Sequence, residues 1–370
     1  MSSRTKPVPI STASAANVVL RVVTHSLVAA MKRLAKWARR TDTRPMLRAY
    51  GPGSDGSPID PATQKIPDGA TWIDLECPTR EEEMLVERCL GVAIPTEADL
   101  EEIEPSSRLY ERGGVLYMTV SALTGVTEGA PTTEPIAFVL TDNRIVTLRY
   151  SAPKSLRAFI SHVGREPELV RDSPTALHRL LDSIIDRMAD ELEHVGSEIE
   201  KISSHIFEAK LEARRIPAAR LTSLLTRIGR TQVLLAKIRY SSVSMGRLLS
   251  FLAGSERMHE GGQTERWRHL GSLATDVNAL SEHANFLSDN LTFLLDASLG
   301  LISIEQNAAM KLFSWAAVVF LPPTLIAGIY GMNFHYFPEL GWHYGYFLAL
   351  GLMLASAVLP YFYFKRRGWI

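Results

Sequence analysis

The residues whose types and spacing suggest chemistry form one stripe in the last quarter of the chain. Carboxylates come first along it, an amide and a thioether follow, and small or hydroxyl-bearing residues come last. They recur at steps near three, four or seven, so on a helix they share roughly one slowly drifting face. The stripe consists of Asp289, Asp296, Gly300, Ser303, Asn307, Met310, Ala317, Leu321, Thr324 and Gly328. This face is too small and too polar for a lipid-facing surface or a bundle core. It suits the lining of an axial pore formed by several copies, and spacing leaves ordinary packing of small residues between membrane helices as an equal alternative.

The helix that carries the stripe runs into a strongly apolar region. Acids and bases balance over the whole chain, with 40 of each, but from Leu312 to Phe364 the only charged side chain is Glu339. Residues 312–330 and 344–364 each approach the roughly 20 apolar residues that span a hydrocarbon core. Aromatic residues stand at the ends of both segments, as an interfacial belt requires. A buried hairpin of a soluble core is the alternative, but two such runs in tandem favour two transmembrane helices.

The charges that flank the two segments predict their orientation. Lys311 precedes the first segment, and Lys365, Arg366 and Arg367 follow the second, whereas the connecting loop 331–343 has no Lys or Arg. Positive residues stay on the cytoplasmic side of a membrane. We therefore expect a multi-pass protein of the cell inner (plasma) membrane with both termini in the cytoplasm and the loop outside.

The hydrophilic part of the chain predicts two kinds of structure. Runs such as TWIDL, GVLYMTV, PIAFVL and RIVTLRY alternate with turn signals and short helical stretches, which indicates a compact α/β domain. After Ser173, expected to cap a helix before Pro174, helical periodicity is almost unbroken. From about Thr264 no proline occurs before Pro322, which predicts a helix of roughly 65 residues and about 100 Å. A helix of that length needs lateral partners.

The predicted fold class is thus an α+β membrane protein in which a very long helix continues as the first of two transmembrane helices. The first residues contain bases but no acid up to Arg40, and we expect a disordered extension there, with a basic amphipathic helix on anionic lipid as the alternative. The expected parts are a basic extension (1–45), a cytosolic α/β domain (46–167), long helices and stalk (168–311), the first transmembrane helix (312–330), the external loop (331–343), the second transmembrane helix (344–364) and a basic cytosolic tail (365–370).

Motifs that would indicate an enzyme do not occur in the sequence. It has no Walker-type phosphate loop, no HExxH and no nucleophile elbow. We expect no enzymatic activity and no nucleic-acid partner.

The region around the two apolar segments resembles the CorA family of divalent metal ion transporters. The resemblance lies in SIEQNAAMKLFSWAAVVFLPPTLIAGIYGMNFHYFPEL and YFYFKRRGWI, and it extends weakly into PSSRLY and PIAFVLTDNRIVTLRY. The family signature, Gly-Met-Asn at the outer end of the first membrane helix, is here Gly331, Met332 and Asn333. The resemblance implies a homopentamer with a cytosolic funnel, a stalk helix that lines the pore, and uptake of Mg²⁺ with Co²⁺ or Ni²⁺ as secondary ions. Residues 1 to about 45 lie outside it.

The resemblance also assigns roles along the stripe. Gly331, Met332 and Asn333 would form the selectivity filter, in which five Asn333 amides contact the water shell that Mg²⁺ holds tightly. Glu339 would attract cations to the mouth, although simple solvation explains a lone loop acid equally well. The remaining predicted positions are pore-lining or gating residues, namely Asn307, Met310, Ala317, Leu321, Thr324 and Gly328, and regulatory Mg²⁺ ligands, namely Asp289 and Asp296.

Two other functions remain open at this point. A zinc transporter of the same superfamily shares Gly-x-Asn, and His335 and His343 beside the filter would suit a softer ion. A membrane-anchored sensor or scaffold that moves no ions would share the same spans. The expected partners are further copies of the chain, membrane lipids and divalent cations.

Overall fold

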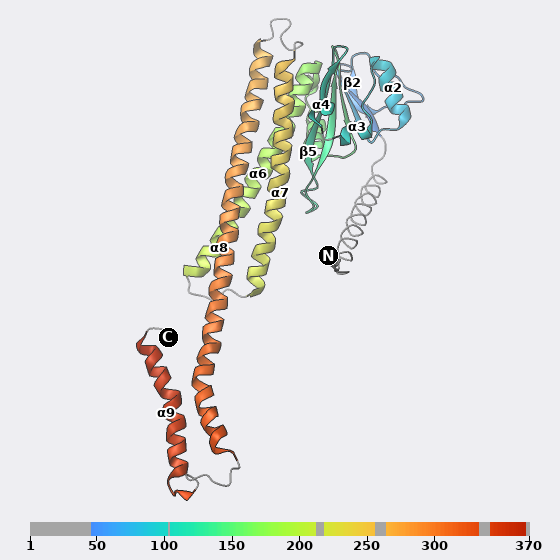
Figure 1. The fold of residues 1–370 in the computed structure, drawn as a ribbon. Helices are drawn as coiled ribbons and strands as arrows, with labels where there is room; N and C mark the ends of the chain where they lie inside the picture. The colour runs from blue at the N-terminus through green and yellow to red at the C-terminus, as the bar shows by residue number, and fades with distance from the viewer. Residues whose placement is uncertain (1–45, 103, 212–217, 256–263, 333–340, 368–370) are drawn as a thin grey trace, which may run out of the picture. The chain divides into compact units, whose positions relative to one another are not determined.

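The computed structural model describes residues 46–102, 104–211, 218–255, 264–332 and 341–367. The chain divides into two compact units. The first contains the residues up to Ile199 together with Arg230–Asp289, and the second contains Glu200–Gly229 together with the residues from Asn290 onward. Figure 1 shows the elements of both units in chain order.

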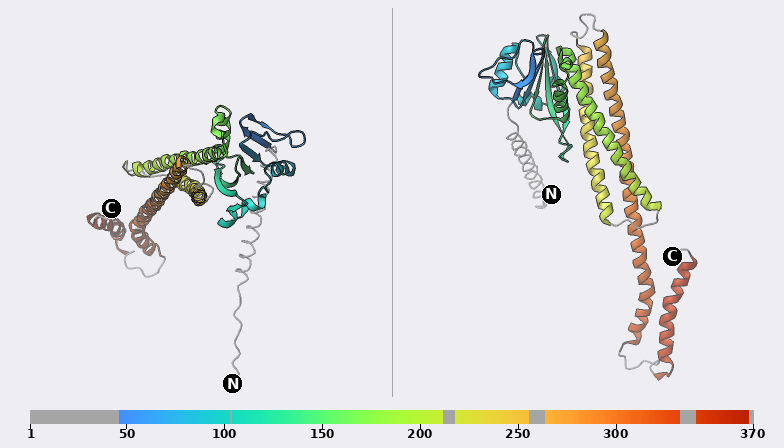
Figure 2. Two further views of the ribbon diagram at one scale, coloured as in Figure 1. Left: turned by 90° about the horizontal axis from the view of Figure 1, so that it is seen from above. Right: turned by 180° about the vertical axis from the view of Figure 1, so that it is seen from behind.

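A seven-stranded mixed sheet forms the centre of the first unit (Figures 1 and 2). The strand order is β2-β1-β3-β7-β6-β5-β4, and every neighbouring pair is antiparallel except β3 with β7. The four runs expected to be strands lie in β3, β5, β6 and β7, which confirms them. The strands are β1 (Met46–Gly51), β2 (Ser54–Pro58), β3 (Trp72–Glu76), β4 (Leu109–Arg112), β5 (Val115–Thr124), β6 (Thr132–Leu140) and β7 (Ile145–Arg149).

Both faces of the sheet are buried. Successive strand residues point to opposite sides, and the residues of each side belong to a hydrophobic core. In β6, Ile136 and Phe138 belong to one hydrophobic core, and Ala137 and Val139 belong to the other. The first core also contains Leu156, Phe159 and residues of the long helices, and the second contains Val86 and Leu100. The short helices are α2 (Arg80–Leu90), α3 (Glu97–Glu101), α4 (Pro105–Arg108), α5 (Lys154–Val163) and the 3₁₀ helix η1 (Pro167–Val170).

Four long helices complete the fold: α6 (Ser173–Leu211), α7 (Ala218–Gly254), α8 (Thr264–Tyr330) and α9 (Gly345–Arg366). Helix α8 has 67 residues and stays helical through Pro322 and Pro323. The helices that contain His269–Tyr330 and Gly345–Arg366 are long and apolar enough to cross a membrane. The cap of α6 was predicted one residue too late. The Asp172 carboxylate, and not Ser173, accepts a hydrogen bond from the Thr175 N–H at 2.8 Å.

A buried polar network joins β3 and β7 inside the first unit. The Arg149 guanidinium donates to both Asp74 oxygens, at 3.1 and 2.8 Å, and to Glu76 at 2.8 Å. The Thr147 hydroxyl donates to Asp74 at 2.6 Å and accepts from the Trp72 indole N–H at 3.1 Å. Burial by itself lowers the pKa of Arg149, but Asp74 and Glu76 outweigh it and raise that pKa above its ordinary value. The guanidinium is therefore charged and fully paired, as a buried ion must be.

Candidate functional site

Within the second unit, helix α8 has one face turned toward α9. The half-buried residues of this face recur at steps of four and three: Trp315, Val319, Pro322 and Ile326. The shielded residues of α9 have the same kind of spacing: Gly345, Ala349, Met353, Ser356 and Pro360. The rings of Trp315 and Tyr361 meet edge to face, with their centroids 5.5 Å apart. The contact of α8 with α9 thus uses a single stripe of α8.

Four of the six predicted pore-lining residues lie on the opposite side of α8. Ala317, Leu321, Thr324 and Gly328 each follow a residue of the α9-facing stripe by two positions. Because each residue turns the helix by about 100°, two positions place them roughly 200° away. All four are exposed, Leu321 to 64%. A single chain therefore leaves this small, partly polar face open, whereas the alternative of packing between the two membrane helices of one chain would have buried it against α9.

Thr324 presents an acceptor on this open face. Its hydroxyl donates to the Phe320 carbonyl at 2.6 Å, so the proton is engaged and the two lone pairs of the oxygen can accept. Pro322 and Pro323 have no N–H to donate, which leaves the carbonyls of Val318 and Val319 without their usual helical partners. Oxygen acceptors of this kind suit the hydrogen atoms of a hydrated cation's water shell.

The glycines of α8 show where another helix could pack closely against it, and Gly331 shows how α8 ends. Around Gly300 and Gly328 an added Cβ would meet nothing within 4 Å, so neither glycine is required by packing within one chain. At Gly331 the N–H donates to the Ala327 carbonyl at 2.9 Å, and a Cβ would lie 3.0 Å from that same oxygen. Glycine is thus the residue that best fits the last turn. Met332 follows, 48% exposed.

Three residues of the predicted mouth lie outside the described residues. They are Asn333 and Glu339, which the resemblance places at the filter and the loop, and His335 of the zinc alternative. His343 is described, and its ring is exposed and contacts Tyr344 with the centroids 5.3 Å apart.

Asn307 and Met310 border a groove of about 690 Å³ on α8 and the end of α9. The other lining residues are Lys311, Ser314, Trp315, Val318, Val319, Pro360, Tyr361 and Phe364. From the sequence, Lys311 is expected only to be a flanking charge, and the spacing of the apolar residues does not predict this groove. Two sequence features could have predicted the groove. They are the four-residue step from Lys311 to Trp315 and the aromatic residues at the end of α9.

Asp289 and Asp296 are both exposed, and each follows a buried leucine, Leu287 or Leu294, by two positions. Each carboxylate therefore points away from the packed side of its own unit. In the part of the chain that the structure describes, no group of three or more His, Cys, Asp or Glu side chains could hold a metal ion.

Comparison with known proteins places these features in one family. The family model described as "CorA-like Mg2+ transporter protein" matches residues 67–366. Magnesium transport protein CorA of Haemophilus ducreyi is 33% identical over 88% of this chain and 100% of its own length. Its Salmonella typhimurium counterpart is 34% identical over 81% of this chain and 92% of its own.

A solved structure supports the fold independently. The complete CorA magnesium transporter from Methanocaldococcus jannaschii matches with a TM-score of 0.70 at 20% identity, covering 89% of this chain and 99% of that chain. From the family match and the two relatives, which cover most of the sequence, it follows that this chain belongs to the CorA-like Mg²⁺ transporter family.

Proposed function

We propose that this chain is the subunit of a homopentameric Mg²⁺ uptake channel, with Co²⁺ and Ni²⁺ as secondary ions. The observation that carries the proposal is the open face of α8, which lies opposite the α9-facing stripe and carries Ala317, Leu321, Thr324 and Gly328. Five such faces around an axis form a conduit in which small residues leave room and Thr324 offers an acceptor. The cytosolic part of the pentamer then forms a funnel. Family membership gives the ion, since the relatives are named magnesium transport proteins.

Selection of the ion belongs to the end of α8. Mg²⁺ exchanges its waters reluctantly, and a cage of carboxylates would hold it too tightly for rapid release. Neutral oxygens from five Asn333 side chains, positioned by the turn at Gly331 and Met332, can instead recognise the hydrated ion by hydrogen bonding to its waters. Glu339 then raises the cation concentration at the outer mouth.

The membrane potential drives uptake without a nucleotide. A divalent cation that crosses an inside-negative membrane gains about 4 to 5 kcal/mol per 100 mV. The basic flanks Lys311 and Lys365–Arg367 favour an inner-membrane orientation with both termini in the cytoplasm. The ion then enters at the loop and leaves toward Asn307.

Gating combines an apolar constriction with a cytosolic sensor. Met310 and Leu321 narrow the conduit and exclude water when the helices approach. Rings of Asp289 and Asp296 from several copies repel one another unless a cation neutralises them. Internal Mg²⁺ that binds the closed arrangement more tightly than the open one therefore closes the channel, since only differential affinity shifts the balance.

The direct test is flux into liposomes that contain the purified full-length chain and a trapped Mg²⁺-sensitive dye. With an inside-negative potential we expect Mg²⁺ entry that empty liposomes do not show. If no Mg²⁺ enters, the chain is a membrane-anchored sensor or scaffold that does not conduct ions. Parallel measurements with Co²⁺, Ni²⁺ and Zn²⁺ and their own indicators separate a magnesium channel from a zinc transporter.

The filter is tested by Asn333→Ala, which should abolish selective Mg²⁺ flux while the oligomer stays intact by size-exclusion chromatography. The matched control is Asn290→Ala, the same change at a position of α8 outside the predicted stripe. Selective flux that survives in the Asn333 variant would remove the amide from the mechanism.

A further inference from the structure

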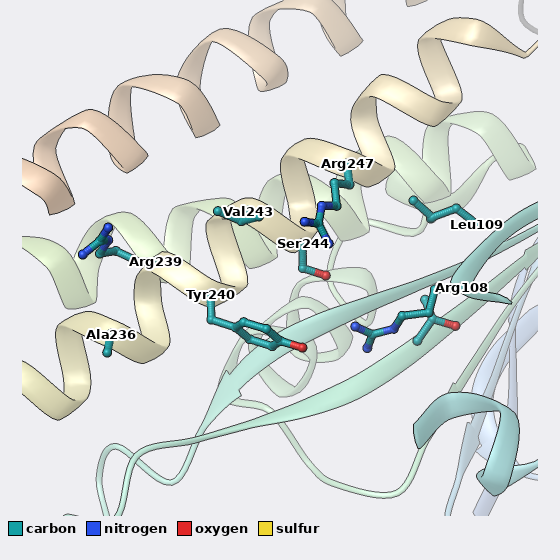
Figure 3. A pocket seen from close by; sticks show the side chains of 9 residues that line it. Arg108, Leu109, Ala236, Arg239, Tyr240, Val243, Ser244 and Arg247 are labelled. Atoms are coloured by element: carbon teal, nitrogen blue, oxygen red, sulfur yellow. The ribbon is translucent and has the colours of Figure 1, made fainter. Parts of the chain in front are cut away.

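An arginine-rich pocket lies in the first unit, where α7 passes β4 and β5 (Figure 3). Its volume is about 350 Å³, at the small end of the roughly 300–1,000 Å³ of small-molecule sites. The lining residues are Arg108, Leu109, Thr119, Ala236, Arg239, Tyr240, Val243, Ser244 and Arg247. Three of them are arginines and none is acidic, so the pocket is cationic.

Hydrogen bonds fix the wall of this pocket. The Ser121 N–H donates to the Ser244 hydroxyl at 3.0 Å, and the Ser241 hydroxyl donates to the Ser121 carbonyl at 2.6 Å. The Arg108 guanidinium donates to the Ser121 hydroxyl at 3.1 Å. Helix α7 is thereby tied to the middle of β5. The Ser244 oxygen accepts in this arrangement, which leaves its own proton free to donate to a bound group.

The positive charges of the pocket are not neutralised. Among the residues that the structure describes, no carboxylate forms an ion pair with Arg108, Arg239 or Arg247, whereas the buried Arg149 pairs with two. The Arg108 Nε is shielded from solvent and has no hydrogen-bond partner. Cationic groups held together without a counter-charge favour an anion that enters from solution.

The polar groups converge on one side of α7. Figure 3 shows the Arg108 guanidinium and the Tyr240 hydroxyl pointing toward each other, with Ser244 and Arg247 nearby on the same side of the helix. Burial raises the pKa of Tyr240, but hydrogen bonding with Ser121 and Arg108 and the charges of Arg108 and Arg247 outweigh it and lower that pKa. The lowered pKa of Tyr240 thus agrees in direction with its hydrogen bonds and with the two arginine charges beside it.

We propose that this pocket binds a small soluble organic phosphate of the nucleotide class. Arg247 and Arg108 supply charge-assisted hydrogen bonds to phosphate oxygens, and the hydroxyls of Tyr240 and Ser244 add neutral donors. Leu109, Val243 and the Tyr240 ring form an apolar wall for the less polar part of the ligand. The proposal does not depend on the ion pathway along α8.

Two other occupants share part of this chemistry. The phosphate of an anionic phospholipid would use the same arginines, and an acidic segment of a second copy would satisfy their charge. The hollow of the pocket and the hydroxyls that flank the arginines favour a small free ligand, because an acidic helix would lie across the pocket and leave it unfilled.

The test is calorimetric titration of ADP into the full-length chain in detergent, with a chelator present so that no Mg²⁺ complex forms. Saturable binding is expected, and adenosine, which lacks phosphate, should bind at least about tenfold more weakly. Arg247→Gln should weaken ADP binding about tenfold or more, and Tyr240→Phe about two- to fivefold. The matched control is Arg230→Gln, an exposed arginine of the same helix outside the pocket, which should bind ADP like the parent.

Several results would overturn the proposal. They are a lack of saturable ADP binding, equal weakening by Arg230→Gln and Arg247→Gln, or equal binding of adenosine and ADP. If native mass spectrometry shows phosphatidylglycerol retained by the parent and lost from the Arg247 variant while ADP does not bind, the ligand is a lipid. If the Arg247 variant loses its oligomeric state and ADP binding is unchanged, the pocket is an interface between copies.

Discussion

The sheet of the first unit and the membrane-length part of α8 use the same apolar side chains in opposite ways. Phe138 in β6 is completely buried, with helices covering both faces of its sheet. Phe313 and Phe320 of α8 are 75% and 69% exposed. A single chain therefore completes the core of the sheet, while the C-terminal helices depend on surroundings that one chain does not provide.

Two kinds of side chain share the open side of α8. A soluble protein rarely exposes a continuous apolar surface of this extent without a partner. Phe313 and Phe320 are large and suit lipid, and Ala317 and Thr324, which lie within about 60° of them around the helix axis, are too small or too polar for it. The open part of α8 thus needs both lipid and further copies of the chain to cover it. The sheet needs neither, because one chain already buries its core.

The largest expected effect is a loss of stability when the buried ion pair of the sheet is broken. Arg149→Met removes the cation that Asp74 and Glu76 share and leaves Asp74 buried without its charge partner. Breaking a buried ion pair costs about 3 to 5 kcal/mol. We expect the free energy of unfolding to fall by about that amount in denaturant titrations of the full-length chain followed by circular dichroism.

The control for this change is an exposed ion pair of the same unit. Arg171→Met removes a pair with Asp172 whose arginine is largely in solvent, and such pairs contribute only about 0 to 1 kcal/mol. Equal losses in the two variants would mean that the buried network carries no special share of the stability.

The two regions also differ in how far the sequence predicts them. Period-2 runs and long apolar segments are local signals, and β3, β5, β6, β7, α8 and α9 follow from them. Strand order is not local. The parallel pairing of Trp72–Glu76 with Ile145–Arg149 brings together Asp74 and Arg149. These two residues are far apart in the sequence, so local signals do not predict their ion pair.

The candidate site divides in the same way. The stripe on α8 is a periodicity on one helix, so its residues could be predicted as a set, and the structure adds that Ala317 and Thr324 face away from α9. The arginine pocket could not be predicted, because Arg108 precedes β4 and Arg247 lies far along on α7. Only the packing of α7 against β5 makes them neighbours. The roles of Asn333 and Glu339 stay predictions.

The second prediction tests whether Ala317 faces the proposed conduit on the open side of α8. Ala317→Leu places a branched side chain on the proposed conduit in every copy, which narrows and dehydrates the path. We expect Mg²⁺ flux into liposomes to fall about tenfold or more. Ala316→Leu makes the same change at an exposed neighbour that is turned by about 100°, and flux should stay near the parent level. Equal flux in both variants would show that Ala317 does not face the ion.

The third prediction concerns the acids of α8 and a smaller effect. If Asp289 and Asp296 bind inhibitory Mg²⁺ between copies, replacing both with Asn removes the ion sites together with the repulsion. Exposed charge pairs contribute about 1 kcal/mol or less each, so the fold should persist and the inhibiting Mg²⁺ concentration should rise about tenfold or more. Flux with internal Mg²⁺ titrated from micromolar to millimolar measures this shift. Asp276→Asn, on the same helix but turned about 140° from Asp289, serves as the control, and an unaltered inhibition curve in the double variant would assign the sensor elsewhere.

The smallest expected effect concerns Asp186 in the first unit. The core of this unit is complete, but among the described residues no ion pair balances the negative charge of this surface carboxylate. Partial burial, together with the negative charges of Asp182, Asp190 and Asp276, raises the pKa of Asp186 above its ordinary 3.8. Asp182 and Asp190 lie near arginines, at 3.5 and 3.8 Å, and no such ion pair at Asp186 occurs within the described ranges.

A carboxyl whose pKa is raised by folding favours the folded state below its unfolded pKa, and that contribution is lost as pH rises through the folded pKa. At pH 7 the ionised Asp186 therefore destabilises the unit slightly. Asp186→Asn should raise the free energy of unfolding by a few tenths of a kcal/mol at pH 7, since the group is largely solvated. The gain should shrink as the pH falls through the raised pKa and vanish below about 3, where the parent carboxyl is protonated in both states. Thermal unfolding at several pH values, with Glu193→Gln of the same helix as an exposed control, measures the difference. A gain that does not change with pH would show that the substitution acts through packing or helix propensity, because charge repulsion at Asp186 must disappear once the carboxyl is neutral.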